Sequence, residues 1–195
     1  RVLFRSCHRT HLRLDDHYVR VLTLKEPPAH TFPLLFQALY EIPSNLVLAS
    51  AWQREGQGAV RREIHAKRRH FHNAKVSLTN YVTDTSATPA DVLIDDSATA
   101  VVRDLGAALT ELTLQGRYFG QYTLTVVLYD RDAAALERSV GACLKAFAAH
   151  DAQVTDERYN LLNAWLAVVP GNGAYNVRGM HLLNTNYADL SLLFA

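Results

Sequence analysis

A cluster of positive charge is the strongest chemical feature of this 195-residue sequence. Between Arg54 and Lys75 lie seven lysine or arginine residues and two glutamates, a local charge of +5 in a chain whose formal net charge is +1. Guanidinium and ammonium groups at this density can bind phosphates, carboxylates or lipid headgroups. The candidate interaction surface consists of six of these basic residues: Arg61, Arg62, Lys67, Arg68, Arg69 and Lys75.

The residues alone leave three uses of this basic surface open. It can be a solvated helix face that an acidic linker partly neutralises, a contact for anionic lipid or an acidic protein, or a nucleic-acid site. Phe71 is the single aromatic residue of the stretch, and the sequence pI is about 8.0. A nucleic-acid-binding module usually has more aromatic residues in its basic stretch and a higher pI. Nucleic acid is therefore the less favoured partner.

Two groups of histidines raise the question of a metal site. Cys7, His8 and His11 lie near the N-terminus, and a second group on the basic stretch contains His65, His70 and His72. Neither group has the i, i+4 histidine pair or the second ligand pair that zinc sites use. We therefore predict no metal site.

The chain also lacks the short motifs of the common catalytic chemistries. It contains neither the G-x-S-x-G of a hydrolase nucleophile nor the G-x-x-x-x-G-K-[ST] loop that holds a nucleoside triphosphate. The run Pro170-Gly171-Asn172-Gly173 has no following lysine and hydroxyl, so it is interpreted as a turn that ends a helix. We predict no catalytic and no cofactor-binding residue, and a stand-alone enzyme is the weakest of the hypotheses.

The composition is that of an ordinary globular protein, with 49% hydrophobic and 20% charged residues. Its apolar runs are shorter than the ~20 residues that span a bilayer. Two distant cysteines, Cys7 and Cys143, favour a reducing, cytoplasmic setting over a disulfide framework. Because the only methionine is Met180 and the chain stops in an apolar run, we expect a fragment of a longer polypeptide.

Two stretches of the sequence each predict a strand–helix–strand unit. The first has β-branched and apolar residues at 17–25, helical spacing from Thr31 to Tyr40, and a second apolar run at 46–52. The second has its strands at 118–129 and 153–156, with a helix over 133–150 between them.

Such tandem units predict an α+β fold with a split β-α-β, ferredoxin-like antiparallel sheet. In that topology the first and third strands are central, and the polar, short 153–156 segment suits an edge.

An inserted helical hairpin is predicted between the two units, at about 57–115. Apolar residues recur every three or four positions over 60–78 and again over 98–112, joined by a polar linker at 79–96 that carries four aspartates. The predicted domain organisation is a residual basic segment at 1–16, the α+β domain with its insertion at 17–158, and a C-terminal helical or linker segment at 159–195.

Several segments resemble the TrbE/VirB/CagE family, the ATPases of conjugative transfer and type IV secretion. The clearest is Ala164–Asn172, followed by Arg178 and by the Leu-Asn-Thr-Asn-Tyr-Ala-Asp run Leu183–Asp189. Tyr18–Pro28 and Phe71–Asn73 are also similar to the TrbE branch. The similar segments occur in the family's order and extend over nearly the whole chain.

The resemblance implies a non-catalytic N-terminal domain that docks a motor to the inner-membrane channel of a type IV secretion system and helps its subunits assemble. The Walker motifs, ATP and Mg²⁺ are then expected only in a motor domain that this chain lacks. The implied partners are inner-membrane components of the system, with self-association and peripheral membrane contact as further options. The implied location is the cytoplasmic side of the bacterial inner membrane, and the alternative function is a nucleic-acid-binding module that uses the basic helix 57–75.

Overall fold

The computed structural model describes residues 4–28, 30–56, 58–62, 64–66, 103, 106–107, 110 and 116–191. The chain divides into two compact units, one formed by Arg1–Gln53 with Gly120–Ala195 and the other by Arg54–Phe119. Each unit is described by itself.

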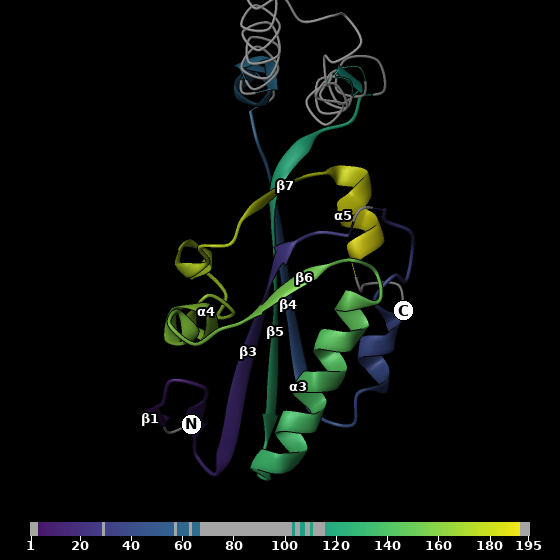
Figure 1. Cartoon of the computed structure of the whole chain (residues 1–195). Helices are drawn as coiled ribbons and strands as arrows, with labels where there is room; N and C mark the ends of the chain where they lie inside the picture. Colours follow the sequence, from purple (N-terminus) through teal and green to yellow (C-terminus); the bar gives the residue numbers. More distant parts are fainter. Residues whose placement is uncertain are drawn as a thin grey trace, which may run out of the picture. The chain divides into compact units, whose positions relative to one another are not determined.

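A mixed set of strands and short helices builds the first unit (Figure 1). The strands form one sheet: β1 Phe4–Cys7, β2 Leu12–Leu14, β3 His17–Glu26, β4 Asn45–Arg54, β5 Phe119–Asp130, β6 Gln153–Asp156 and β7 Met180–Leu183. The helical elements are the 3-10 helices η1 Gln37–Glu41 and η3 Gly173–Tyr175 and the α-helices α3 Ala133–Ala148, α4 Leu161–Leu166 and α5 Asn184–Leu190.

The structure has the predicted α+β fold, with an antiparallel arrangement of its central strands. β3 pairs antiparallel with β5, with Leu22 opposite Val126. β4 lies on the far side of β5, and β6 pairs antiparallel with β3 on its other side. The order β6-β3-β5-β4 places the first and third predicted strands at the centre, as the split β-α-β arrangement requires.

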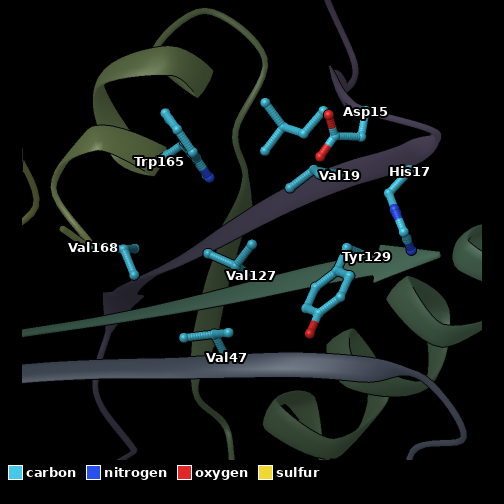
Figure 2. A pocket seen from close by; sticks show the side chains of 9 residues that line it. Asp15, His17, Val19, Val47, Val127, Tyr129, Trp165 and Val168 are labelled. Carbon is cyan, nitrogen blue, oxygen red and sulfur yellow. The ribbon is translucent and has the colours of Figure 1, made fainter. Parts of the chain in front are cut away.

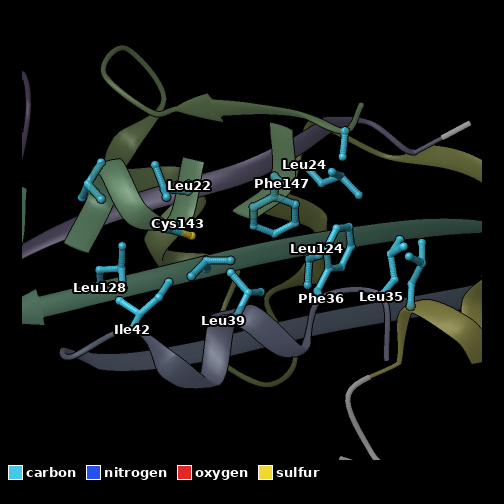
Figure 3. Packing of buried hydrophobic residues seen from close by; sticks show 14 of the residues in the cluster. Leu22, Leu24, Leu35, Phe36, Leu39, Ile42, Leu124, Leu128, Cys143 and Phe147 are labelled. Atoms are coloured by element: carbon cyan, nitrogen blue, oxygen red, sulfur yellow. The ribbon is translucent and has the colours of Figure 1, made fainter. Parts of the chain in front are cut away.

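One face of the sheet, called the first face, carries the main core. Leu22 and Leu24 of β3 and Leu124 of β5 point to this side, where they pack with η1 and α3 (Figure 3). Val126 of β5 belongs to the same cluster. Phe36, just before η1, contacts Phe147 of α3 with ring centroids 4.5 Å apart. The alternation of side chains along a strand sends the intervening residues to the opposite, second face.

Helix α3 confirms the prediction for residues 133–150 to within two residues at its end. The carboxylate of Asp132 caps the helix by accepting a 2.8 Å hydrogen bond from the N–H of Ala134. Leu136, Val140 and Cys143 recur at helical spacing and are buried. Burial raises the pKa of the Cys143 thiol to about 12, because an apolar environment disfavours the thiolate.

The predicted α-helix from Thr31 to Tyr40 is wrong in type. The chain makes a turn and then the 3-10 helix η1, because Leu34 has a φ of 64°, which no α-helix accommodates. The apolar pattern nevertheless marks the buried side correctly, since Leu35, Phe36 and Leu39 are all buried. Phe32, the first residue of the predicted apolar face, is 49% exposed.

The predicted residual basic segment at 1–16 forms two strands in its described part. β1 and β2 make a hairpin, and β2 pairs antiparallel with β3. Leu12 and Leu14 are buried, and a two-residue turn at Asp15–Asp16, with Asp15 at a φ of 50°, joins β2 to β3. Strands this short leave too few residues for an alternating pattern to be recognised.

The C-terminal segment at 159–195 is more than the predicted helix and linker. After α4 and a turn in which Gly171 has a φ of 91°, the chain adds β7, which pairs with β5, and the helix α5. Leu182 of β7 and Leu190 of α5 join the main core. The segment therefore belongs to the first unit.

Candidate interaction surfaces

The described part of the basic surface is a short amphipathic helical segment. Residues 58–62 and 64–66 are helical. Arg61 and Arg62 are exposed, whereas Val60 and Ile64 are buried at 5% and 8% exposure. The other four candidates, Lys67, Arg68, Arg69 and Lys75, lie outside the described residues, as do the acidic linker and most of the predicted second arm of the hairpin. The hairpin thus stays a prediction.

The N-terminal histidines meet in the β1–β2 hairpin. The rings of His8 and His11 stack with centroids 4.6 Å apart, and Cys7 beside them is exposed. Burial lowers the pKa of His11, and the charges of His8, Arg20 and Arg13 lower it further. Within the described ranges, no group of three His, Cys, Asp or Glu side chains could hold a metal ion.

The second face of the sheet contains an apolar hollow of about 420 Å³ (Figure 2). Strands β3, β4 and β5 form its floor through Val19, Val47 and Val127, and Trp165 and Val168 close it from α4 and the turn that follows. Its other lining residues are Leu14, Asp15, His17 and Tyr129. The sequence did not predict this hollow, since its walls come from four separate segments of the chain.

A histidine–aspartate pair lies at the margin of the hollow. His17 Nδ1 is 2.8 Å from Asp16 Oδ1, and Asp16 Oδ2 is 2.8 Å from Nε of Arg131. A carboxylate that orients an imidazole can prepare it as a general base, but that chemistry also needs a nucleophile within reach. No serine, threonine or cysteine is among the residues that line this hollow. The valine, leucine and tryptophan side chains of the lining suit contact with an apolar group.

Further along the second face, a buried carboxylate anchors the C-terminal segment. Glu157 is only 1% exposed. It accepts hydrogen bonds from the Thr23 hydroxyl and from the guanidinium of Arg178, and its own N–H donates to the carbonyl of Val21 at 2.9 Å. The hydrogen bond to Glu157 raises the pKa of Arg178. Thus Arg178, part of the family resemblance, neutralises a charge that would otherwise be buried alone.

A buried arginine ties the sheet to α3. Arg20, in the middle of β3, is 7% exposed and bonds both Asp156 of β6, at 2.6 Å, and Glu137 of α3. Burial lowers its pKa, but the hydrogen bonds and charges of Asp156 and Glu137 outweigh that effect and raise it. Neither Arg20 nor Glu157 was predicted from the sequence. The available signal was a charged residue inside, or directly after, an apolar strand.

The Asn-Thr-Asn-Tyr-Ala-Asp run has a packing role in this unit. Tyr187 stacks on Trp52 of β4, with ring centroids 5.8 Å apart. The hydroxyl of Thr31 donates to Asp189 at 2.7 Å and accepts from the side-chain amide of Asn186 at 2.9 Å. These contacts hold α5 against β4 and the segment before η1.

The helices in the described part of the chain were also compared with the requirements of a membrane span. None of these helices combines the length and the apolar character needed to cross a bilayer.

Comparison with known proteins identifies the relatives of this chain. A sequence model of the "CagE, TrbE, VirB family, component of type IV transporter system" matches residues 85–178. A probable conjugal transfer protein TrbE of Sinorhizobium fredii (strain NBRC 101917 / NGR234) is 21% identical over 178 residues, or 91% of this chain. The "Conjugal transfer protein TrbE" of Rhizobium radiobacter is 23% identical over 177 residues, also 91% of the chain.

The chain is shorter than these relatives, covering 26% and 21% of their respective lengths. These matches confirm the resemblance to the TrbE/VirB/CagE family.

Proposed function

Because this chain is a relative of the CagE, TrbE, VirB family of type IV transporter components, we propose that it is a non-catalytic docking and assembly domain of a conjugal-transfer ATPase. The similarity to TrbE along nearly the whole chain is the observation that carries the proposal. In this proposal ATP and Mg²⁺ bind in a separate motor domain of the protein, since the P-loop sequence that holds them is absent from these 195 residues.

The proposed docking partners are inner-membrane components of the transporter, met on the cytoplasmic side of the bacterial membrane. The basic surface is the proposed contact. Arg61 and Arg62 support this assignment because their side chains are exposed while their helical segment buries Val60 on its other side. A basic cluster near a membrane gains on the order of 1 kcal/mol per charge from anionic lipid or an acidic partner.

The test uses the full-length protein that contains this chain, with the double change Arg61→Glu/Arg62→Glu. We expect conjugal transfer and co-purification with the inner-membrane components to fall about tenfold or more, since two attractive charges become repulsive. ATP hydrolysis should change by less than about twofold, since these residues lie outside the proposed motor.

A matched control reverses two exposed basic residues on α3, Arg138→Glu/Lys145→Glu, with the same change in net charge. The control should leave transfer and co-purification unchanged. Equal losses in both variants would show that net charge causes the effect, and would contradict a specific contact at Arg61 and Arg62. ATP hydrolysis by the 195-residue chain alone would contradict a non-catalytic domain.

Nucleic-acid binding is the second candidate, favoured by the local charge of +5 between Arg54 and Lys75. It predicts DNA binding with a dissociation constant of about 1–100 μM that weakens steeply with salt and is lost in Arg61→Glu/Arg62→Glu. Binding that is insensitive to salt, or to these two changes, would reject it.

A further inference from the structure

Strand β4 is a long edge strand with an open side. It is the last strand in the sheet order β1-β2-β3-β5-β4, and no strand in the described part of the chain pairs with its outer side. None of its ten residues is fully buried, whereas six consecutive residues of β3 are. Its outward N–H and C=O groups therefore offer a template for another strand.

This edge lacks the features that usually prevent strands from pairing. From Asn45 to Gln53 the sequence Asn-Leu-Val-Leu-Ala-Ser-Ala-Trp-Gln contains no charged residue and no proline. Natural edge strands are commonly protected by lysine, proline or short length. Strand β6, which pairs with one side of β3, is protected by its short length of four residues. These two strands of one sheet are thus built differently.

Both faces of β4 carry apolar side chains that its single neighbour covers only in part. Leu46, Leu48 and Trp52 pack partly buried against the main core. Val47, on the second face at the hollow, is 42% exposed. A strand added outside β4 would extend the sheet and cover the remaining apolar surface on both sides.

We propose that a second copy of this chain pairs with β4, antiparallel and centred on Ala49 about a twofold axis. The uncharged segment 45–53 has Ala49 at its midpoint, so its two copies match along their whole length. The pairing places Asn45 opposite Gln53, Leu46 opposite Trp52 and Val47 opposite Ala51, so polar meets polar and apolar meets apolar in these three pairs, and Leu48 lies opposite Ser50. No like charges meet within it, and the contact is isologous.

This pairing specifies how the chain would contribute to assembly, and it rests on the assembly role in the proposed function and not on the docking role. Its test uses purified chain without membrane components, so a negative result here would leave the docking proposal standing.

The first experiment measures mass in solution by sedimentation. The wild-type chain should be a dimer at about 100 μM, above the micromolar dissociation constants of modest specific interfaces. Ala49→Lys and Ala49→Glu should each weaken the dimer by about tenfold or more, because like charges then lie directly opposite each other across the twofold axis. Mixing the two variants should restore a dimer.

A monomeric wild-type chain would overturn the proposal. So would an Ala49→Lys dimer as tight as wild type, or a mixture of the two variants that stays monomeric. Far-ultraviolet circular dichroism checks that each variant is folded. Ala142→Lys is the matched control, since Ala142 is an exposed alanine of α3 that lies outside β4, and it should leave the dimer intact.

The second experiment traps the pairing covalently. In a Cys7→Ser background, Ala49→Cys should form a disulfide-linked dimer on mild oxidation, because paired Cα atoms about 4.5–5.5 Å apart lie within disulfide reach. Ala142→Cys in the same background should cross-link at least about tenfold more slowly, since exposed cysteines outside the interface meet only by diffusion. Equal rates at the two positions would contradict β4 pairing.

Discussion

The two faces of the sheet are formed by the same strands but are covered to different extents. On the first face, η1 and the 16-residue helix α3 cover Leu22, Val126 and their neighbours completely. On the second face, the six-residue helix α4 covers Val21 and Val127 but leaves the 420 Å³ hollow beside them. The difference shows that apolar strand residues are necessary for a sealed core, whereas the length of the covering element decides whether it is sealed.

The second face has less apolar cover, and buried polar groups that hydrogen-bond one another occupy part of it. Its β3 residue Thr23 is 2% exposed and bonds Glu157, and Thr125 of β5 lies opposite Thr23 across the strand pair and is equally buried. The first face also has a charged centre beside its apolar cluster, since Arg20 of β3 is 7% exposed and bonds Asp156 of β6 and Glu137 of α3. Charge pairing should therefore stabilise both faces, and the second face, with its shorter covering helix, should depend on it more.

The largest effect should come from removing the cation of the second face. Arg178→Met leaves Glu157 ionised, buried and bonded only by Thr23, so we expect a loss of about 3–5 kcal/mol in the free energy of unfolding. Glu157→Gln should cost less, about 1–3 kcal/mol, because a neutral amide is cheaper to bury and Arg178 can turn towards water. Urea denaturation at neutral pH measures both.

The double variant Glu157→Gln/Arg178→Met separates charge from packing. It should be more stable than Arg178→Met alone, since the uncompensated carboxylate is gone. Additive losses would show that the ion pair stabilises the second face only through its contact area.

An intermediate effect should separate two adjacent valines of β5 that point to opposite faces. Val126→Phe places extra atoms in the packed core and should cost about 2–3 kcal/mol. Val127→Phe directs them toward the hollow and should change stability by less than about 1 kcal/mol. Val126 and Val127 are 1% and 5% exposed, so exposure alone does not predict the difference. Equal costs, compared by thermal and urea unfolding, would show that the hollow closes in solution.

The smallest effect should be a pH dependence confined to the hairpin that supplies Leu12 and Leu14 to the second face. The folded His11 has a pKa below its ordinary value of 6.5, so the unfolded chain binds more protons near that pH. Stability from this group is therefore present above the ordinary pKa and is lost as the pH falls through it. His11→Gln should make unfolding less sensitive to a change from pH 7.5 to about 5.5.

The two tryptophans can report this change face by face. Trp165 belongs to the second face and Trp52 packs against the first-face core. In a Trp52→Phe background, unfolding followed by Trp165 fluorescence should show the pH effect of His11. The same pH sensitivity in His11→Gln would assign the effect to other groups.

Much of the central fold could be predicted from local patterns. The strand at 153–156 and helix α3 were placed closely, because strong periodicity and a capping aspartate are encoded within a few residues. The central positions of β3 and β5 followed from their long β-branched and apolar runs. In contrast, η1 depends on the positive φ of Leu34, and β2 and β7 are too short to carry a pattern.

The candidate sites were predictable to a smaller extent. Charge density identifies the basic surface directly, and the structure shows Arg61 and Arg62 exposed on it. The hollow, the pair of Glu157 with Arg178 and the open edge of β4 could not be predicted, because each depends on residues that are far apart along the chain. Glu157 and Thr23, for example, are 134 positions apart.

The sequence by itself determined the central strands and helix α3, where positive charge gathers, and the family that the chain resembles. These properties are local, or they are preserved as similarity along the chain. Only the tertiary structure decided which face of the sheet is sealed, which charges are buried in pairs and which strand edge is left open. The physical reason is that burial of a residue depends on what covers it, and the covering elements here come from distant regions of the chain.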